Sequence, residues 1–362
     1  MSKNTSLFNP VLAKRKGKNA DKKTWTNLQG SSSSLAIYHG ACNAESPVLL
    51  LTHDTPSAIR IEQELKSLNT NKALSICLFP DWETLPYDTF SPHQDIISQR
   101  LATLYQLSRM ERGVVIVPVC TLLQRISPKK YLDLNSLIIK KGDRKDLHQL
   151  RQELEASGYR AVDQVMEHGE FCARGAIIDL FPMGSKTPFR LDFFDDEIDE
   201  IRLFDPESQR SSDKVDGIDL LPAHEFPTDK DGINLFRSQY REMFTGNIPK
   251  DSVYHQVSNG ILPAGIEYYL PLFFDETNTL CDYLSENTLV IISGDIDKAQ
   301  TQFWADAQYR YEDRKYNTSR PLLAPEKLFL NSEELYSAIK PYDRIVLQAQ
   351  NTEQTTDDTA NE

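Results

Sequence analysis

The segment NLQGSSSSLAIYHG, residues 27–40, is the first place where the sequence could bind a nucleotide. A phosphate-binding loop needs glycines before a helix, a lysine for the phosphates and a serine or threonine for magnesium. Gly30 leads the segment, but Ser33 stands where the lysine would be, and Ser34 follows it. A charged hydrogen bond to phosphate contributes about 1.5–3 kcal/mol, so losing the lysine is severe. The segment therefore predicts a serine-rich turn.

An acidic pair at a strand end is the second requirement of such a site, because carboxylates hold the magnesium ion. The strand run VIISGDID instead has Ser293 and Gly294 at this point, with Asp295 and Asp297 beyond them. This pattern predicts a polar strand end. We expect no catalytic residue, no cofactor and no metal in this chain.

Other reactive side chains form no recognisable pattern. The seven histidines are scattered, without paired-ligand spacing. Residues 79–95, FPDWETLPYDTFSPHQD, bring four acids and one histidine together and could suggest acid–base chemistry. The same residues are rich in proline and aromatic side chains, which favours a packed loop over the sheet.

Two arginines stand in similar settings, Arg174 in GEFCARGAIIDLF and Arg190 in FRLDFFDDEIDEI. Residues 167–210 hold eleven Asp or Glu against five Lys or Arg, with six of the acids between residues 192 and 200. One interpretation makes the two arginines surface partners of those acids, in exposed pairs worth about 0–1 kcal/mol each. The other makes them anchors of a protein interface, where arginine and aromatic residues dominate the binding energy. Strand alternation places Phe194 on the face of Arg190, away from three apolar neighbours, which favours the interface. We expect all three to be exposed, so that replacing them leaves folding intact.

Hydrophobic periodicity indicates the elements that position these residues. Three apolar runs predict buried strands and two stretches predict helices, in the order 48–54, 55–68, 74–79, 95–107 and 114–119. Strands and helices in alternation predict a parallel sheet covered by helices.

After about residue 134 short strands joined by acidic or glycine turns predict a smaller α+β domain, and after residue 212 longer helices and a buried strand return. We therefore expect an α/β fold with one parallel-sheet domain in two chain segments, 28–134 and 213–348. The α+β domain, 135–212, is inserted between them.

The two ends of the chain have the composition of tails. Residues 1–27 hold seven Lys or Arg against one acid, which predicts a flexible basic arm. Residues 349–362 hold four acids and no base, which is typical of a linker. We expect this acidic linker to lead to C-terminal domains of a longer protein.

Composition excludes several classes of protein. A net charge of −13 over 362 residues argues against a protein that coats nucleic acid over its whole surface. The five cysteines are widely spaced, so a disulfide framework or zinc site is not expected and a cytoplasmic location is. No apolar run is long enough to span a membrane, and we expect no membrane contact.

Four strings resemble the N-terminal region of the bacterial transcription-repair coupling factors, the Mfd family. They are DWETLPYDTFSPHQDIISQRLATLYQL, GYRAVDQVMEHGEFCARGAIIDLFPMGS, RLDFFDDEIDEIR and LLPAHEFPTDK, and the likeness covers about residues 28–348. The same stretch resembles, more weakly, the first domains of the excision-repair helicase UvrB. In that comparison Gly30 to Ser34 fall on the phosphate loop of UvrB, with Ser33 in place of its lysine. Ser293 and Gly294 fall near its acidic helicase motif.

The resemblance implies a degenerate helicase-like domain carrying the inserted domain with which UvrB docks on UvrA. The family's UvrA-contacting residues match Arg174, Arg190 and Phe194. The module would recruit UvrA, for nucleotide excision repair, to RNA polymerase stalled at a lesion. ATP and magnesium, DNA translocation and polymerase binding would belong to C-terminal domains absent from this chain, one of which masks the UvrA-facing surface.

Two alternatives remain open. An active UvrB-like DNA-binding ATPase is opposed by the missing lysine and acidic pair. A structural or autoinhibitory domain that packs against the translocase would use the same surface as UvrA.

Overall fold

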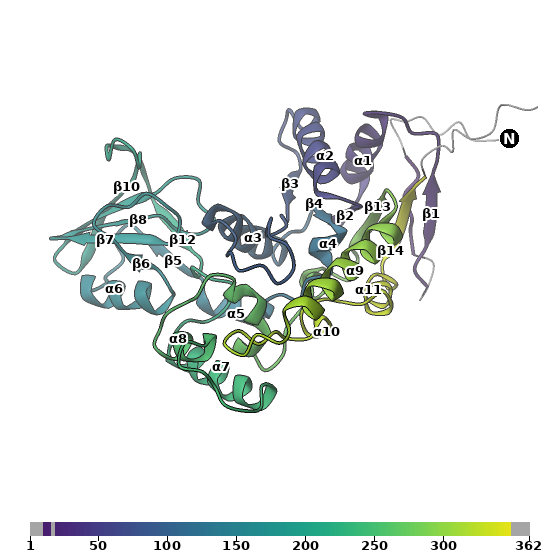
Figure 1. The fold of residues 1–362 in the computed structure, drawn as a ribbon. Coiled ribbons are helices and arrows are strands. Elements are labelled where there is room, and N and C mark those ends of the chain that lie inside the picture. Colours follow the sequence, from purple (N-terminus) through teal and green to yellow (C-terminus); the bar gives the residue numbers. More distant parts are fainter. Residues whose placement is uncertain (1–9, 16–18, 349–362) are drawn as a thin grey trace, which may run out of the picture.

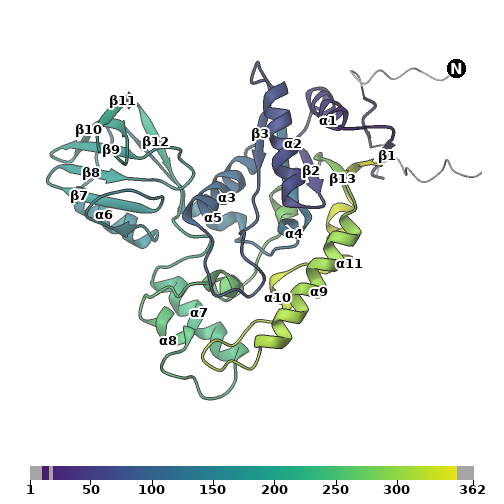
Figure 2. The ribbon, with the colours of Figure 1, turned by 45° about the horizontal axis from the view of Figure 1, so that its top comes forward.

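The computed structural model describes residues 10–15 and 19–348. Figures 1 and 2 show a parallel sheet flanked by helices, with a second sheet at the opposite end of the molecule from β1. A group of helices, among them α7 and α8, lies below both sheets in the view of Figure 1.

The parallel sheet has six strands in the order β1-β14-β13-β2-β4-β3. Their bounds are Lys22–Trp25 (β1), Val48–Thr52 (β2), Ser75–Leu78 (β3), Gly113–Pro118 (β4), Leu289–Ser293 (β13) and Asp343–Leu347 (β14). The central strands β2 and β4 are buried along their whole length, because helices cover both faces of the sheet. The expected parallel sheet built from two chain segments is confirmed.

The helices divide between the two faces. On one face, α1 (Ser32–Asn43) and α2 (Thr55–Leu68) share a core with Leu50 and Ile116. On the other, α3 (Gln94–Leu107), α4 (Val119–Leu122) and α9 (Ile296–Arg314) share a core with Leu49 and Leu51. Successive side chains of β2 point to opposite faces of the sheet, so Leu49 and Leu51 join one core and Leu50 joins the other.

The amino-terminal segment differs from the expected flexible arm. Lys22–Trp25 form β1 and pair in parallel with β14, although residues 1–9 and 16–18 lie outside the described part of the chain. The backbone amides of Arg15 and Asp21 each donate a hydrogen bond of 2.8 Å to the carboxylate of Asp343. Residues 22–25 have the lysine-rich composition of a solvated tail. They form a strand because the edge of β14 has backbone groups with which this segment can pair. The expected acidic linker, 349–362, also lies outside the described residues.

The second sheet contains both hairpins expected from the sequence. Its order is β11-β10-β9-β8-β7-β6. The bounds are Arg160–Ala161 (β6), Glu170–Arg174 (β7), Ile177–Leu180 (β8), Phe189–Phe194 (β9), Glu197–Phe204 (β10) and Ser211–Val215 (β11). Helix α6 (Leu147–Ala156) buries Leu150 and Leu154 in the same core as Leu191 of β9.

The inserted domain does not end at residue 212 as expected. Strand β5 (Leu137–Lys140) pairs antiparallel with β12 (Gly217–Leu220), so the chain after residue 212 still belongs to this part of the fold. The remaining elements are α5 (Lys129–Asn135), α7 (Lys230–Met243), α8 (Val253–Ser258), η1 (Ile266–Phe273), η2 (Leu280–Tyr283), α10 (Pro325–Leu328) and α11 (Ser332–Ile339). Among the described helices, none combines the length and the apolar character needed to cross a membrane.

A buried ion pair joins the inserted domain to the parallel-sheet domain. Arg100 on α3 donates from Nε to Oε1 of Glu225 over 2.9 Å, and both side chains are almost completely buried, at 0% and 1% exposure. The indole of Trp82 donates to the other oxygen of Glu225, also over 2.9 Å. Arg100 Nη1 donates to the carbonyl of Pro80. One carboxylate therefore holds together α3, the loop after β3 and the end of the inserted domain.

Glu267 in η1 predicts a dependence of stability on pH. Its carboxylate accepts a hydrogen bond from Ser91 Oγ over 2.9 Å, and burial raises its pKa to about 7. Because this folded-state pKa lies above the unfolded value of about 4.3, its contribution to stability is complete below pH 4 and is lost as the pH rises towards 7. We expect Glu267→Gln to raise the melting temperature by a few degrees at pH 8 and to leave it nearly unchanged at pH 4.5. Thermal unfolding at both pH values checks this, and equal shifts at the two would contradict it.

Candidate functional site

The two hairpins lie side by side in the inserted sheet, because β8 pairs with β9. The strand register puts Asp179 of β8 directly between Cys172 of β7 and Arg190 of β9. Side chains two positions apart share a strand face, so Arg174 lies on the same face, one step further along β7. The sheet thus brings together the two arginines that are far apart in the sequence.

Both arginines bind one carboxylate, that of Asp179. Arg190 donates from Nε to Oδ1 over 2.7 Å and from Nη2 to Oδ2 over 2.9 Å. Arg174 donates from Nη2 to Oδ2 over 2.7 Å. The Asp179 side chain is only 1% exposed. A buried carboxylate needs charged donors of this kind, since an unpaired charge in the interior is costly.

The surroundings of the two arginines differ. Arg190 is 19% exposed, and its Nη1 also donates to Ser211 Oγ over 3.1 Å and weakly to the Gln209 carbonyl at 3.4 Å. Hydrogen bonding to Asp179 raises the pKa of its guanidinium above the usual value. Arg174, in contrast, is 55% exposed. The expectation that both arginines are exposed is therefore wrong for Arg190.

The acids that follow Arg190 have other partners or none. Glu200 pairs with Lys214 and Arg202, which lower the pKa of its carboxyl, and Arg202 also lies 3.7 Å from Asp192. Neither Arg174 nor Arg190 forms an ion pair with an acid between residues 192 and 200 within the described chain. Their partner is Asp179, one of the eleven acids of residues 167–210, so the first interpretation is right about a nearby acid. It is wrong about an exposed pair, because the carboxylate of Asp179 is buried.

Phe194 ends β9 with its ring in solvent, at 79% exposure, the largest value among exposed Phe, Leu, Ile and Val side chains of the described chain. Its neighbours Leu191 and Phe193 are buried on the opposite face of the strand. This confirms the alternation read from the sequence. Asp195 follows with a positive φ of 58°, which turns the chain into β10. An exposed aromatic ring and a half-exposed arginine on one face of a sheet are typical of a protein interface.

Asp179 is the residue that the sequence reading missed. Its signal was present in GAIIDLF, where a carboxylate in an apolar strand stands on the face of the neighbouring arginines. A buried carboxylate in such a strand requires a cation, and Arg174 and Arg190 are the arginines of the two neighbouring strands β7 and β9.

The expected degenerate nucleotide site lies at the carboxyl edge of the parallel sheet. Gly30 adopts a positive φ of 52° before α1, and Ser34 is buried and donates its hydroxyl to Glu64. Ser33 brings a neutral hydroxyl to the position where a phosphate loop has its lysine. The other oxygen of Glu64 pairs with Arg60 over 3.1 Å, so the serine-rich turn is held to α2.

Ser293 and Gly294 end β13 at the same edge, two strands from β1 in the sheet order. Gly294 has a φ of 87°, and a Cβ atom built there would lie 2.2 Å from Nδ1 of His53. The His53 ring therefore occupies the space that a side chain at position 294 would need. No group of three or more His, Cys, Asp or Glu in the described residues is arranged to hold a metal ion.

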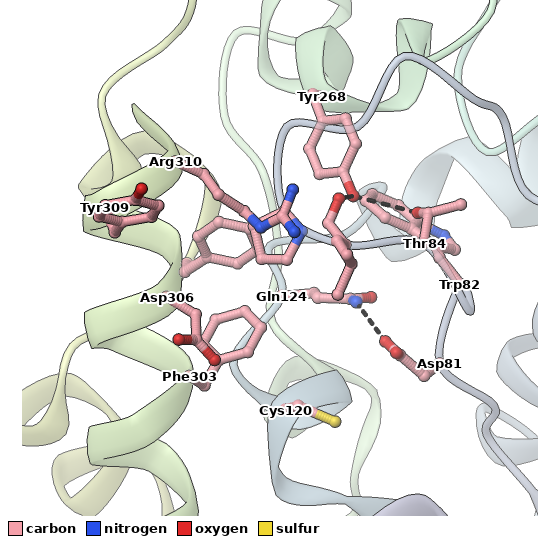
Figure 3. A pocket seen from close by; sticks show the side chains of 13 residues that line it. Asp81, Trp82, Thr84, Cys120, Gln124, Tyr268, Phe303, Asp306, Tyr309 and Arg310 are labelled. Carbon is pink, nitrogen blue, oxygen red and sulfur yellow. Dashed lines mark hydrogen bonds between the residues drawn. The ribbon is translucent and has the colours of Figure 1, made fainter. Parts of the chain in front are cut away.

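A cavity of about 420 Å³ lies between α9 and the loop after β3, and Figure 3 shows Arg310 pointing into it. The aromatic side chains in its wall are Trp82, Tyr268, Tyr309, Phe303 and Phe329.

Burial raises the pKa of two side chains that line this cavity, Asp81 and Cys120. Gln124 donates to Asp81 over 2.9 Å (Figure 3), and burial raises the pKa of Asp81. Burial also raises the pKa of Cys120 to about 12, so the thiol stays protonated. The thiol of Cys120 is therefore not an activated nucleophile.

Comparison with known proteins assigns the inserted part of the fold to a class. Residues 137–226 match the UvrB interaction domain family. This span includes both hairpins and the β5–β12 pair, and the protein is one that carries a UvrB interaction domain.

Longer similarity identifies the family. The chain is 50% identical over 351 residues to the transcription-repair coupling factor of Haemophilus influenzae and 49% identical over 324 residues to that of Escherichia coli. These matches cover 96% and 89% of this chain but 30% and 28% of the relatives. The Bacillus subtilis protein of the same name is 29% identical over 281 residues. The chain belongs to the transcription-repair coupling factors, by similarity to their N-terminal region, and it spans less than a third of their length.

Proposed function

We propose that this chain is the module with which a transcription-repair coupling factor recruits UvrA to RNA polymerase stalled at a lesion, by imitating UvrB. The observation that carries the proposal is the exposed Phe194 ring on the same sheet face as the half-exposed Arg174, two strands away, in a UvrB interaction domain. Titration of purified UvrA into the chain, followed by calorimetry, tests it. Absence of binding at micromolar concentrations would refute the proposal.

The rest of the proposal concerns the longer protein. RNA polymerase binding, DNA translocation and ATP hydrolysis with magnesium would reside in C-terminal domains, and one of these would mask the Arg174 and Phe194 surface until UvrA is needed. Such masking joins the autoinhibitory alternative to the recruiting function, because the same surface serves both. We propose a cytoplasmic location, because nucleotide excision repair acts on the bacterial chromosome.

We expect the chain neither to bind nor to hydrolyse ATP. The segment Gly30 to Ser34 lacks a lysine, and Ser293 and Gly294 replace the acidic pair that would hold magnesium. Isothermal titration with Mg-ATP and a phosphate-release assay check this. ATP turnover that a Ser33→Ala substitution abolishes would contradict it and would favour the UvrB-like ATPase.

A further inference from the structure

We propose that the cavity between α9 and the loop after β3 is a docking site for a tryptophan side chain of a protein partner, next to an acidic residue in the partner's sequence. None of the residues that line the cavity belongs to the inserted sheet, so such a partner binds independently of UvrA. Three features point to this occupant: the aromatic walls, a buried acceptor without a partner and an arginine without a counter-charge.

The cavity lies at the carboxyl edge of the parallel sheet. Asp81 comes shortly after β3 ends at Leu78, and Cys120 comes shortly after β4 ends at Pro118. Open α/β sheets bind their ligands outside the carboxyl ends of the strands. The volume of about 420 Å³ is within the range of about 300–1,000 Å³ that is usual for ligand pockets. Position and size therefore both suit an occupant.

Aromatic rings favour a flat occupant. Five of the thirteen residues that line the cavity are aromatic. Trp82 packs edge-on against Tyr268 with ring centres 5.5 Å apart, and Phe303 lies on α9 on the other side of the cavity (Figure 3). A planar ring that enters between them can stack on one wall and meet the other edge-to-face.

Gln124 favours an occupant with an N–H donor. Its side chain is 5% exposed, and its Nε2 donates to Asp81 over 2.9 Å. Its Oε1 is buried and has no hydrogen-bond partner among the described residues. An unpaired buried acceptor is costly, and a donor on the occupant removes that cost. The indole of tryptophan is a flat ring whose nitrogen is a donor only, so it matches both the walls and Gln124.

Arg310 favours an acidic neighbour of the tryptophan. Its side chain points into the cavity (Figure 3), and within the described chain it forms no hydrogen bond or ion pair. Asp306, one helical turn earlier, accepts a hydrogen bond from Gln302 over 3.0 Å instead. A carboxylate of the partner can bind the free guanidinium in the two-pronged geometry that arginine allows.

The rim of the cavity favours a protein over a small molecule. Leu85 and Tyr309 line the cavity and are 55% and 75% exposed. A polypeptide that continues beyond the tryptophan covers these side chains, whereas a ring inside the cavity leaves them in water. A nucleotide fits less well, because Arg310 is the single cation among the lining residues and none of them is a glycine. Phosphate groups need several donors from such residues.

Titration with blocked peptides, followed by ligand-observed NMR, tests the occupant. We expect the tripeptide Glu-Trp-Leu to bind. Blocking the ring nitrogen with 1-methyltryptophan should weaken binding about tenfold, because Oε1 of Gln124 is left unpaired. Replacing the peptide's glutamate with glutamine should weaken it about threefold. N-acetyltryptophan amide, which leaves the rim uncovered, should bind about tenfold more weakly than the tripeptide.

Two variants of α9 tie the charge preference to the cavity. Arg310→Gln should remove the preference for the glutamate peptide over the glutamine peptide. Lys298→Gln removes a charge from an exposed position of the same helix, outside the cavity, and should keep that preference. Circular dichroism confirms that both variants are folded.

Each arm has an outcome that overturns the proposal. No binding of the tripeptide at about 10 mM excludes a tryptophan site of even millimolar affinity. Equal binding of the 1-methyltryptophan peptide shows that Gln124 is not a contact, and an unchanged charge preference in Arg310→Gln shows the same for Arg310. If N-acetyltryptophan amide binds as tightly as the tripeptide, the cavity takes a small molecule and is not a docking site.

Discussion

Replacing Glu225 with alanine is expected to lower the free energy of unfolding by about 3–5 kcal/mol, the usual cost of breaking a buried ion pair. The substitution leaves the Arg100 guanidinium fully buried without its counter-charge and removes the acceptor of the Trp82 indole. Three segments that meet at Glu225 lose their common partner. Denaturation in urea, read by circular dichroism, measures the change.

A matched control uses an exposed pair of the same type. Glu155 on α6 pairs with Arg151 over 3.0 Å, and both side chains are about half exposed. Glu155→Ala should cost at most about 0.5 kcal/mol, because exposed helix pairs contribute little. A loss below 1 kcal/mol for Glu225→Ala would show that water or a rearranged side chain satisfies Arg100.

The second large effect is on binding. Phe194→Ala and Arg174→Ala are each expected to weaken UvrA affinity about thirtyfold or more, which corresponds to about 2 kcal/mol. The unfolding free energy should change by less than about 0.5 kcal/mol for Phe194→Ala, because the ring makes few contacts in the free protein. Calorimetric titration with UvrA and urea denaturation provide the two measurements.

Phe90 is the control for Phe194. Its ring is 68% exposed in the loop before α3, outside the inserted sheet. Phe90→Ala removes the same side chain from another part of the surface and should leave UvrA affinity unchanged. If Phe194→Ala binds UvrA as tightly as the unmutated chain does, or if Phe90→Ala loses as much affinity, the assignment of the binding surface is contradicted.

Much of the fold could be predicted from the sequence, because local hydrophobic patterns indicate the strands and helices. The apolar runs at 48–54 and 114–119 became the buried strands β2 and β4, since only a strand covered on both faces is apolar throughout. Strand β1 could not be predicted in this way. Its residues, Lys22–Trp25, look like a solvated tail, and they form a strand only because β14, more than 300 residues later, offers its edge.

The sequence by itself determined the two hairpins, the exposure of Phe194 and the missing phosphate-site lysine, because these depend on residue type and a period of two. Only the tertiary structure decided that Arg190 is built into the sheet while Arg174 remains half exposed. That difference depends on the pairing of β8 with β9, which brings Asp179 opposite Arg190. The Arg100–Glu225 pair could not be predicted from the sequence either, because its residues lie 125 positions apart. Burial and register between distant segments set these contacts, and no local pattern encodes them.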